Sequence, residues 1–127
     1  MADTLHLGLP YLAAAQAQKH VTMNEALRRL DAIVQLTVDT AGETAPPAVP
    51  SEGERHIVGA GAGGAWAGKD GAVAHFVDGA WSFLAPEAGW LAYDRAGRAF
   101  LVFDDEAWKA VPGPETVATL WGNATPD

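Results

Sequence analysis

The chain has 127 residues, a net charge of −8 and no cysteine. This length predicts a single domain, and the lack of cysteine excludes disulfides, thiolate catalysis and cysteine metal sites. The acidic balance, with no basic cluster larger than Arg28-Arg29, argues against nucleic acid and membranes as partners. No apolar run is long enough for a transmembrane helix, and residues 1–10 lack the pattern of a secretory signal peptide.

The clearest helical pattern lies near the N-terminus. Thr22 followed by Glu25 matches a capping box, in which each side chain bonds a free backbone amide of the first turn. Apolar residues then recur at spacings of four, three and four, which is typical of one helix face. This stripe consists of Met23, Leu27, Leu30 and Val34, and it is widened by Ala26 and Ile33. We predict a long helix over residues 23–36, a short helix within residues 13–20 and a break near Val21-Thr22.

The chain changes character after the helix. Residues 41–54 predict a Pro-rich connector, because prolines donate no backbone hydrogen bond and favour extended geometry. From residue 55 onward, short apolar runs alternate with turn residues, which indicates strands. The clearest hairpin joins residues 72–77 to residues 80–85 through Asp78-Gly79, the preferred pair for a type I′ turn. Further strands are expected at residues 55–58, 89–94, 99–104 and 108–111.

A weak internal repeat relates two of these hairpins. Residues 76–81 (FVDGAW) align with residues 103–108 (FDDEAW) at a constant offset of 27 positions. Each copy reads as a strand, a tight acidic turn and a second strand that begins near a tryptophan. We interpret the two copies as similar hairpins of one sheet; two copies are too few for a propeller or a solenoid.

These elements predict an α+β fold. Its N-terminal helical segment, a short helix plus one long helix, is followed by a small antiparallel β-meander with one face packed on the helix. The expected divisions are a helical assembly segment (residues 1–40), the Pro-rich connector (residues 41–54), an antiparallel β domain (residues 55–112) and a loosely ordered C-terminal tail (residues 113–127).

Catalytic and metal-binding patterns are weak. The four histidines, at positions 6, 20, 56 and 75, have no metal-ligand spacing, and neither of the two serines lies in a nucleophile motif. The sequence alone leaves a glycosidase with paired carboxylates open. We nevertheless expect no enzyme activity, no metal and no cofactor.

The five tryptophans have two interpretations. Large aromatic side chains fill the space between a sheet and a helix, and we predict this packing role for Trp81 and Trp108. Aromatic faces also stack on sugars. Trp66 lies beside a glycine-rich loop and is expected to be exposed, so Trp66 and Trp90 are the candidate glycan contacts.

Several motifs carry a family resemblance: the block containing QAQKHVT, NEALR and LDA, the Pro-rich connector, and the runs EGERHIV, GAWAG, DGAWSFLAP and GWLAYD. With these motifs the chain resembles the domain-of-unknown-function family 2793. The resemblance covers roughly residues 5–111. This family is found in phages, prophages and gene transfer agents of alphaproteobacteria. Its pattern is expected to have His at the position of Met23, where Met favours an apolar contact.

The resemblance implies a structural virion protein that is made in the bacterial cytoplasm and assembled into the particle. Its expected place is the base of a head spike, which links a capsid vertex to a fibre that binds host capsular polysaccharide. The implied partners are the capsid protein, a spike or tail fibre protein and further copies of the chain, in a fivefold ring at a vertex. Two alternatives stay open: a carbohydrate-binding receptor module and a tail or baseplate component. Because the chain ends soon after the β region, we expect an attachment unit without its own receptor domain.

We predict that the N-terminal segment forms the contact with other subunits or the capsid. Small Ala and Gln side chains permit close approach of a neighbour, and the apolar stripe is wider than one small sheet needs. The candidate interface residues are Tyr11, Ala13, Gln16, Ala17, Lys19, His20, Met23, Leu27, Leu30 and Val34.

Overall fold

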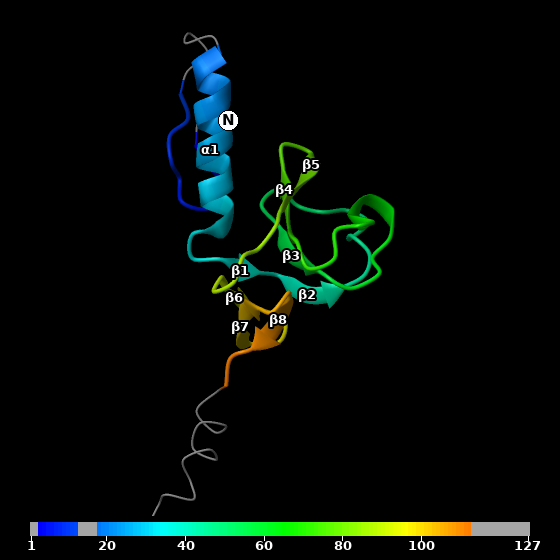
Figure 1. The fold of residues 1–127 in the computed structure, drawn as a ribbon. Helices are drawn as coiled ribbons and strands as arrows, with labels where there is room; N and C mark the ends of the chain where they lie inside the picture. The colour runs from blue at the N-terminus through cyan, green and yellow to red at the C-terminus, as the bar shows by residue number, and fades with distance from the viewer. Residues whose placement is uncertain (1–2, 13–17, 113–127) are drawn as a thin grey trace, which may run out of the picture.

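The computed structural model describes residues 3–12 and 18–112, with the side chains of residues 18–20 excepted (Figure 1). One α-helix, α1 (Gln18–Ile33), precedes the strands. Two four-stranded sheets follow, with the strand orders β1-β6-β7-β8 and β2-β3-β4-β5. The strands are β1 (Thr37–Val38), β2 (Thr40–Glu43), β3 (Arg55–Val58), β4 (Val73–Val77), β5 (Ala80–Leu84), β6 (Leu91–Asp94), β7 (Ala99–Asp104) and β8 (Ala107–Ala110), and a short 3₁₀ helix, η2 (Gly64–Trp66), lies between β3 and β4.

The predicted α+β fold with a single antiparallel meander is wrong. The described residues form a mostly β structure, in which each sheet contains one parallel pair. β1 pairs in parallel with β6, and β2 pairs in parallel with β3. These pairings escaped the sequence analysis because residues 37–43 form strands only through partners far along the chain, without local turn signals.

β1 and β2 are consecutive pieces of one extended segment that leaves the first sheet and joins the second. The change occurs at Asp39, the residue between the two strands. Strands that switch sheets at a bend are the usual way for two packed sheets to share a corner. Residues 37–43 therefore connect the two sheets covalently and fix where they meet.

The internal repeat is confirmed as a pair of similar hairpins. Phe76 lies opposite Trp81 in β4–β5, and Phe103 lies opposite Trp108 in β7–β8. Both aromatic pairs are edge-to-face, with ring centroids 5.1 Å and 5.4 Å apart. Both two-residue loops have positive φ angles, as a type I′ turn requires. The hairpins nevertheless belong to different sheets, and not to one meander.

The predicted break near Val21-Thr22 is also wrong, because α1 continues through both residues. Good helix formers precede them, so Thr22 lies inside the helix and not at its start. The helix ends at Ile33, earlier than predicted, and Gln35 then adopts a left-handed φ of 55°. This turn directs Leu36 into the core, where it is buried. Most of the predicted short first helix lies outside the described residues.

The main core lies between the two sheets and the C-terminal end of α1. Its buried residues are Ala32, Leu36, Val38, Ile57, Val73, Leu84 and Ala92. A second cluster packs on the other face of the β2–β5 sheet and contains Val58, Ala62, Trp66 and Ala74. The β2–β5 sheet is therefore covered on both faces.

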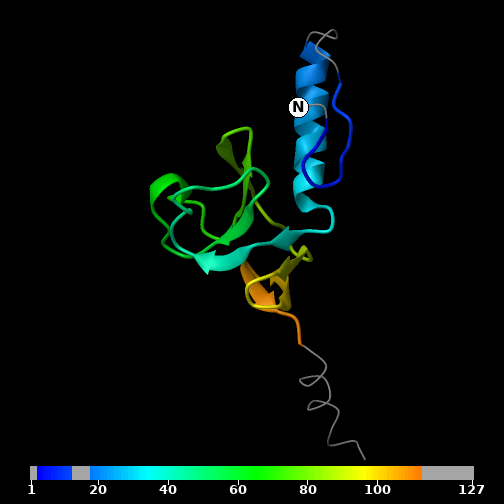
Figure 2. The same cartoon turned by 180° about the vertical axis from the view of Figure 1, so that it is seen from behind.

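α1 does not lie across a sheet as predicted. It stands beside the strands and approaches them at its C-terminal end, while the segment of residues 3–12 runs along its side (Figures 1 and 2). Most of the helix surface is consequently free to meet solvent or another protein.

Candidate assembly surface

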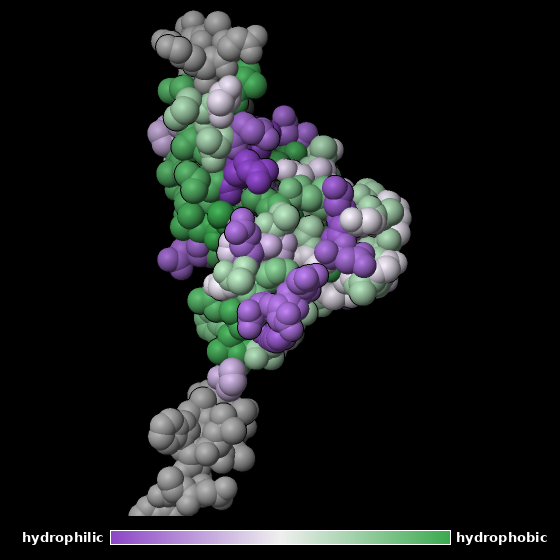
Figure 3. Space-filling model, viewed as in Figure 1, coloured by the Kyte–Doolittle hydropathy of each residue, from purple (hydrophilic) through white to green (hydrophobic). Residues whose placement is uncertain are grey.

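The predicted apolar stripe of α1 is largely exposed. Met23 is 49% exposed, Leu30 is 50% exposed and Val34, just beyond the helix, is 40% exposed, whereas Leu27 is half-buried. Figure 3 shows apolar residues gathered along α1 and again over the strands below it. Contiguous exposed apolar surface on a small domain marks an interaction site more often than chance. We call Met23, Leu27, Leu30 and Val34 the helix stripe.

The polar side of α1 makes the contacts within the chain. Asp31 is 1% exposed and accepts hydrogen bonds from the backbone N–H groups of His6 (2.9 Å) and Leu7 (2.6 Å). The Asn24 side chain exchanges two hydrogen bonds with the backbone of Leu12. The N-terminal segment thus covers the polar side of the helix and leaves the helix stripe uncovered.

The charge state of Asp31 follows from these contacts. Burial by itself raises the pKa of its carboxyl, but hydrogen bonds from Thr4, Leu7 and His6 outweigh burial, and the pKa lies below its usual value. A buried carboxylate that accepts several hydrogen bonds binds the donor segment strongly. It holds residues 4–9 against the helix.

A histidine pair joins the same segment to the β2–β5 sheet. The Nε2 atoms of His6 and His75 are 3.1 Å apart, so one ring donates a hydrogen bond and the other accepts it. His75 is 2% exposed in β4, and burial beside His6 and Arg55 lowers its pKa to about 4. Burial and the Arg55 charge also lower the pKa of His6. The pair is therefore neutral at physiological pH.

Arg55 anchors the C-terminal end of α1. It is 8% exposed, and its Nη1 donates a 3.0 Å hydrogen bond to the carbonyl oxygen of Ala32 in the last helical turn. A cation near the last carbonyls of a helix is favourable, because those groups carry partial negative charge. β3 therefore fixes the direction in which the helix leaves the sheets.

A second uncovered apolar surface lies on the β6–β7 hairpin. Leu91 is 58% exposed and Phe100 is 55% exposed, and Phe100 packs edge-to-face on Tyr93. Together with Ile33 and Leu36 these side chains line a pocket of about 620 Å³ at the foot of α1. We call Leu91, Tyr93 and Phe100 the sheet shelf.

The sequence analysis missed the sheet shelf, although a signal was present. The run AFLVF in β7 is apolar at every position, whereas a strand with one solvated face alternates apolar and polar residues. Leu101 faces the core, and Phe100 lies on the opposite face. An unbroken apolar strand is typical of a strand that is covered on both faces, yet among the described residues nothing covers Phe100, which is 55% exposed.

Trp66 was predicted to be a glycan contact because it was expected to be exposed. That expectation is wrong, because Trp66 is fully buried. Its ring packs edge-to-face on Trp81 at 5.3 Å and lies 5.4 Å from the ring of His56. The glycine-rich loop folds over the β2–β5 sheet and carries Trp66 inward with η2. Trp90 is half-buried and packs against the main core.

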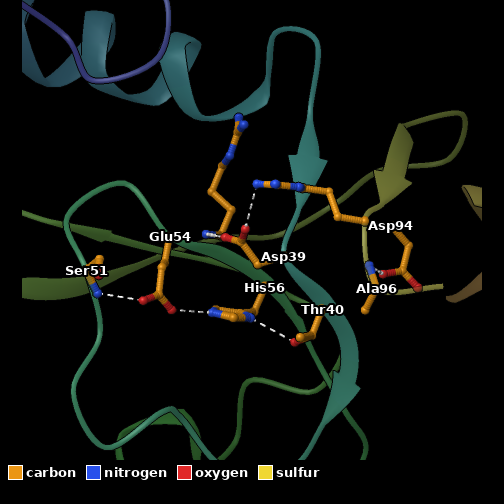
Figure 4. Close-up of polar contacts among 9 residues, drawn as sticks. Asp39, Thr40, Ser51, Glu54, His56, Asp94 and Ala96 are labelled. Atoms are coloured by element: carbon orange, nitrogen blue, oxygen red, sulfur yellow. Dashed lines mark hydrogen bonds and ion pairs between the residues drawn. The ribbon is translucent and has the colours of Figure 1, made fainter. Parts of the chain in front are cut away.

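Thr40, His56 and Glu54 form a chain of hydrogen bonds (Figure 4). This chain lies next to the aromatic cluster, because the His56 ring is within 6 Å of the Trp66 and Trp81 rings. The Thr40 hydroxyl is 2.8 Å from His56 Nδ1, and His56 Nε2 is 2.8 Å from a Glu54 carboxylate oxygen. The order resembles that of a nucleophile, a base and an acid, but sheet geometry accounts for it fully. Thr40 and His56 are cross-strand partners, and Glu54 lies two residues before His56 on the same side. The chain of hydrogen bonds satisfies a buried histidine and ties β2 to β3.

Asp39 joins the sheets by polar contacts as well. Its carboxylate accepts hydrogen bonds from the Arg55 backbone N–H at 3.0 Å and from Arg95 Nη1 at 3.3 Å (Figure 4). The Arg95 pair is exposed, so its contribution to stability is small. The backbone contact is the one that fixes the bend between β1 and β2.

Of the remaining candidate interface residues, the structure describes the side chain of Tyr11 but not those of the others. Tyr11 is half-buried, and its hydroxyl accepts a 3.5 Å hydrogen bond from Arg28. Ala13, Gln16 and Ala17 lie outside the described residues, and Lys19 and His20 belong to α1 without described side chains. Within residues 3–12 and 18–112, no three His, Asp or Glu side chains group as metal ligands. The one helix in this part of the chain is too short and polar to cross a membrane.

These features define a class: a small two-sheet domain that carries a projecting helix with an exposed apolar stripe. The model of the family described as "Protein of unknown function (DUF2793)" matches residues 23–109, from the first turns of α1 into β8. The chain belongs to this family. No curated protein and no solved structure matches it.

Proposed function

We propose that the chain is a structural virion protein of a phage or gene transfer agent, and that it forms the base of a head spike between the capsid vertex and a host-binding fibre. In this role it assembles with further copies of itself through α1. The particle context comes from the family resemblance. The role requires binding surfaces and no catalysis.

The observation that carries the proposal is the exposed helix stripe. Two large apolar side chains of α1, Met23 and Leu30, and Val34 just beyond its end are each 40% to 50% exposed. The polar contacts of Asn24, Arg28 and Asp31 occupy the neighbouring face of the helix. These polar contacts hold the helix in place. The apolar helix stripe, whose burial would be the most favourable, stays exposed.

The overall shape supports an adaptor. α1 projects at one end of the molecule, and the β6–β8 strands lie at the other end (Figure 1). Two separated ends allow one chain to contact two different partners at once. The burial of Trp66 removes the main support for the alternative of a carbohydrate-binding receptor module.

The test uses light scattering and particle attachment. Wild-type protein and Leu30→Asp are measured for mass, and both are added to particles that lack this chain. We expect the wild type to form a multimer and attach, because its stripe is apolar. Leu30→Asp should stay monomeric and unattached, since a carboxylate at the stripe cannot be desolvated without large cost.

Arg29→Lys is the control, because Arg29 is exposed on the same helix outside the stripe and the change keeps its charge. It should assemble and attach like the wild type. Circular dichroism should show equal helix content in all three proteins. A monomeric wild type, or a Leu30→Asp variant that assembles and attaches normally, would contradict the proposal.

A further inference from the structure

We propose that the helix stripe of one copy binds the sheet shelf of a second copy, so that the contact joins unlike surfaces. This inference rests on the proposed self-assembly and specifies its geometry. It assigns a partner to the two large uncovered apolar surfaces of the described residues: the helix stripe and the sheet shelf.

The two surfaces have complementary shapes. The helix stripe is a convex ridge of Met23, Leu27 and Leu30 on a helix that stands beside the sheets (Figure 2). The sheet shelf borders a pocket of about 620 Å³ at the foot of α1, which is wide enough to receive a row of aliphatic side chains. A ridge packed into a groove buries more area than two ridges in contact.

Charge favours the same pairing. Residues 18–36 contain three basic residues, Lys19, Arg28 and Arg29, against two acidic ones. Residues 37–112 contain eleven acidic residues against five basic ones. The helix is therefore the basic part of an acidic chain, and it is attracted to the body of another copy more than to another helix.

Unlike surfaces have a consequence for assembly. Each subunit has one ridge and one groove, so a contact of this kind can close into a ring or continue as a filament. A contact between two stripes would instead end at a dimer. The proposed contact therefore fits a ring at a capsid vertex.

The experiment mixes two inactive variants. Leu30→Asp removes the stripe and keeps the shelf, and Leu91→Asp removes the shelf and keeps the stripe. Both residues are half exposed, at 50% and 58%, so the single chain should fold with either change. Phe100→Ser serves as a second shelf variant, and circular dichroism checks the fold of each protein.

Each variant alone should have the mass of one chain by light scattering. An equimolar mixture should double that mass, because one intact stripe meets one intact shelf and both outer ends are blocked. If either shelf variant alone assembles like the wild type, or if the mixture stays monomeric, the stripe does not bind the shelf and the inference is wrong.

Different results would contradict the proposed function and the stripe–shelf contact. A monomeric wild type would contradict self-assembly and therefore the proposed function. A multimeric wild type with no recovery in the mixture would contradict only the pairing of stripe and shelf. Shelf variants that assemble but no longer attach to particles would assign the shelf to a different protein, which also overturns the inference.

Discussion

The hairpins β4–β5 and β7–β8 share a sequence pattern, a register and a turn type, yet their surroundings differ. β4 is buried at four of its five positions, whereas no residue of β7 is fully buried. The first hairpin belongs to a sheet with the main core on one face and the Trp66 cluster on the other. The second belongs to a sheet with a core on one face and the exposed sheet shelf on the opposite face.

The unequal burial of the two hairpins shows that a repeated sequence pattern determines local structure but not burial. The pair of Phe and Trp across a type I′ turn forms in both copies, because register and turn geometry are local properties. Whether a face is covered depends on distant segments, here residues 3–12 and η2. The exposed face of β6–β7, which carries Leu91 and Phe100, is the surface to which we assign the proposed contact with a second copy.

The largest expected difference between the sheets is in stability. Trp66→Ala should lower the free energy of unfolding by about 3–5 kcal/mol, because it opens a large cavity in the covered sheet. Leu91→Ala, in the exposed sheet, should change it by less than about 0.5 kcal/mol. Both are measured by urea unfolding in the Leu30→Asp background, so that assembly does not contribute. Equal effects would remove the distinction between the sheets.

A second prediction concerns acid. The folded state keeps His75 neutral with a pKa of about 4, whereas the unfolded chain titrates near 6.5. The unfolded state therefore binds the proton first as the pH falls, and stability present above pH 6.5 is lost between pH 6.5 and pH 4, by on the order of 3 kcal/mol. Urea unfolding across this range should show the loss, and His75→Asn should flatten the slope. A wild-type slope of zero would contradict the buried neutral pair.

A third prediction tests the joint between β2 and the loop after β3. A Cβ atom on Gly59 would clash with the Gly42 carbonyl oxygen, a backbone atom that cannot rotate away. Gly59→Ala should therefore lower stability by about 1–3 kcal/mol. Gly63→Ala is the matched control, because nothing lies within 4 Å of its Cβ position. Thermal unfolding of the two variants should differ clearly; similar melting temperatures would show that β2 is not held closely there.

The smallest expected effect compares the two hairpin turns directly. Glu106 has a φ of 63° at the position where the first hairpin has Gly79, with a φ of 75°. A left-handed conformation strains a residue with a Cβ. Glu106→Gly should thus raise stability by up to about 1 kcal/mol, and Gly79→Glu should lower it by a similar amount. If both changes have the same sign, the turns are not equivalent.

Local features were predictable from the sequence, and non-local ones were not. The alternation of strands, the Asp78-Gly79 turn and the helix stripe follow from spacing and turn chemistry. The parallel pairings of β1 and β2 depend on partners elsewhere in the chain, and residues 37–43 have no pattern that selects those partners. This is why the sequence predicted one meander where two sheets form.

Dependence on distant segments also explains which parts of the candidate site could be predicted. Periodicity identified the helix stripe but could not show that residues 3–12 bind the polar side of the helix and leave the stripe exposed. A glycine-rich neighbourhood suggested that Trp66 is exposed, yet the 3₁₀ helix η2 places its side chain inward, where it is fully buried. The sheet shelf had a readable signal in the apolar run of β7.

The most direct measurement follows the solvent exposure of Met23 in the assembled protein. Met23 is 49% exposed in the single chain and lies in the helix stripe. After mild peroxide treatment, mass spectrometry compares the rate of its oxidation in wild type and in Leu30→Asp. We predict rapid oxidation in the monomeric variant and slow oxidation in the wild type, because in the proposed assembly a second copy covers the stripe. Equal rates in two proteins with intact helices would mean that the stripe remains exposed after assembly, which contradicts the central claim.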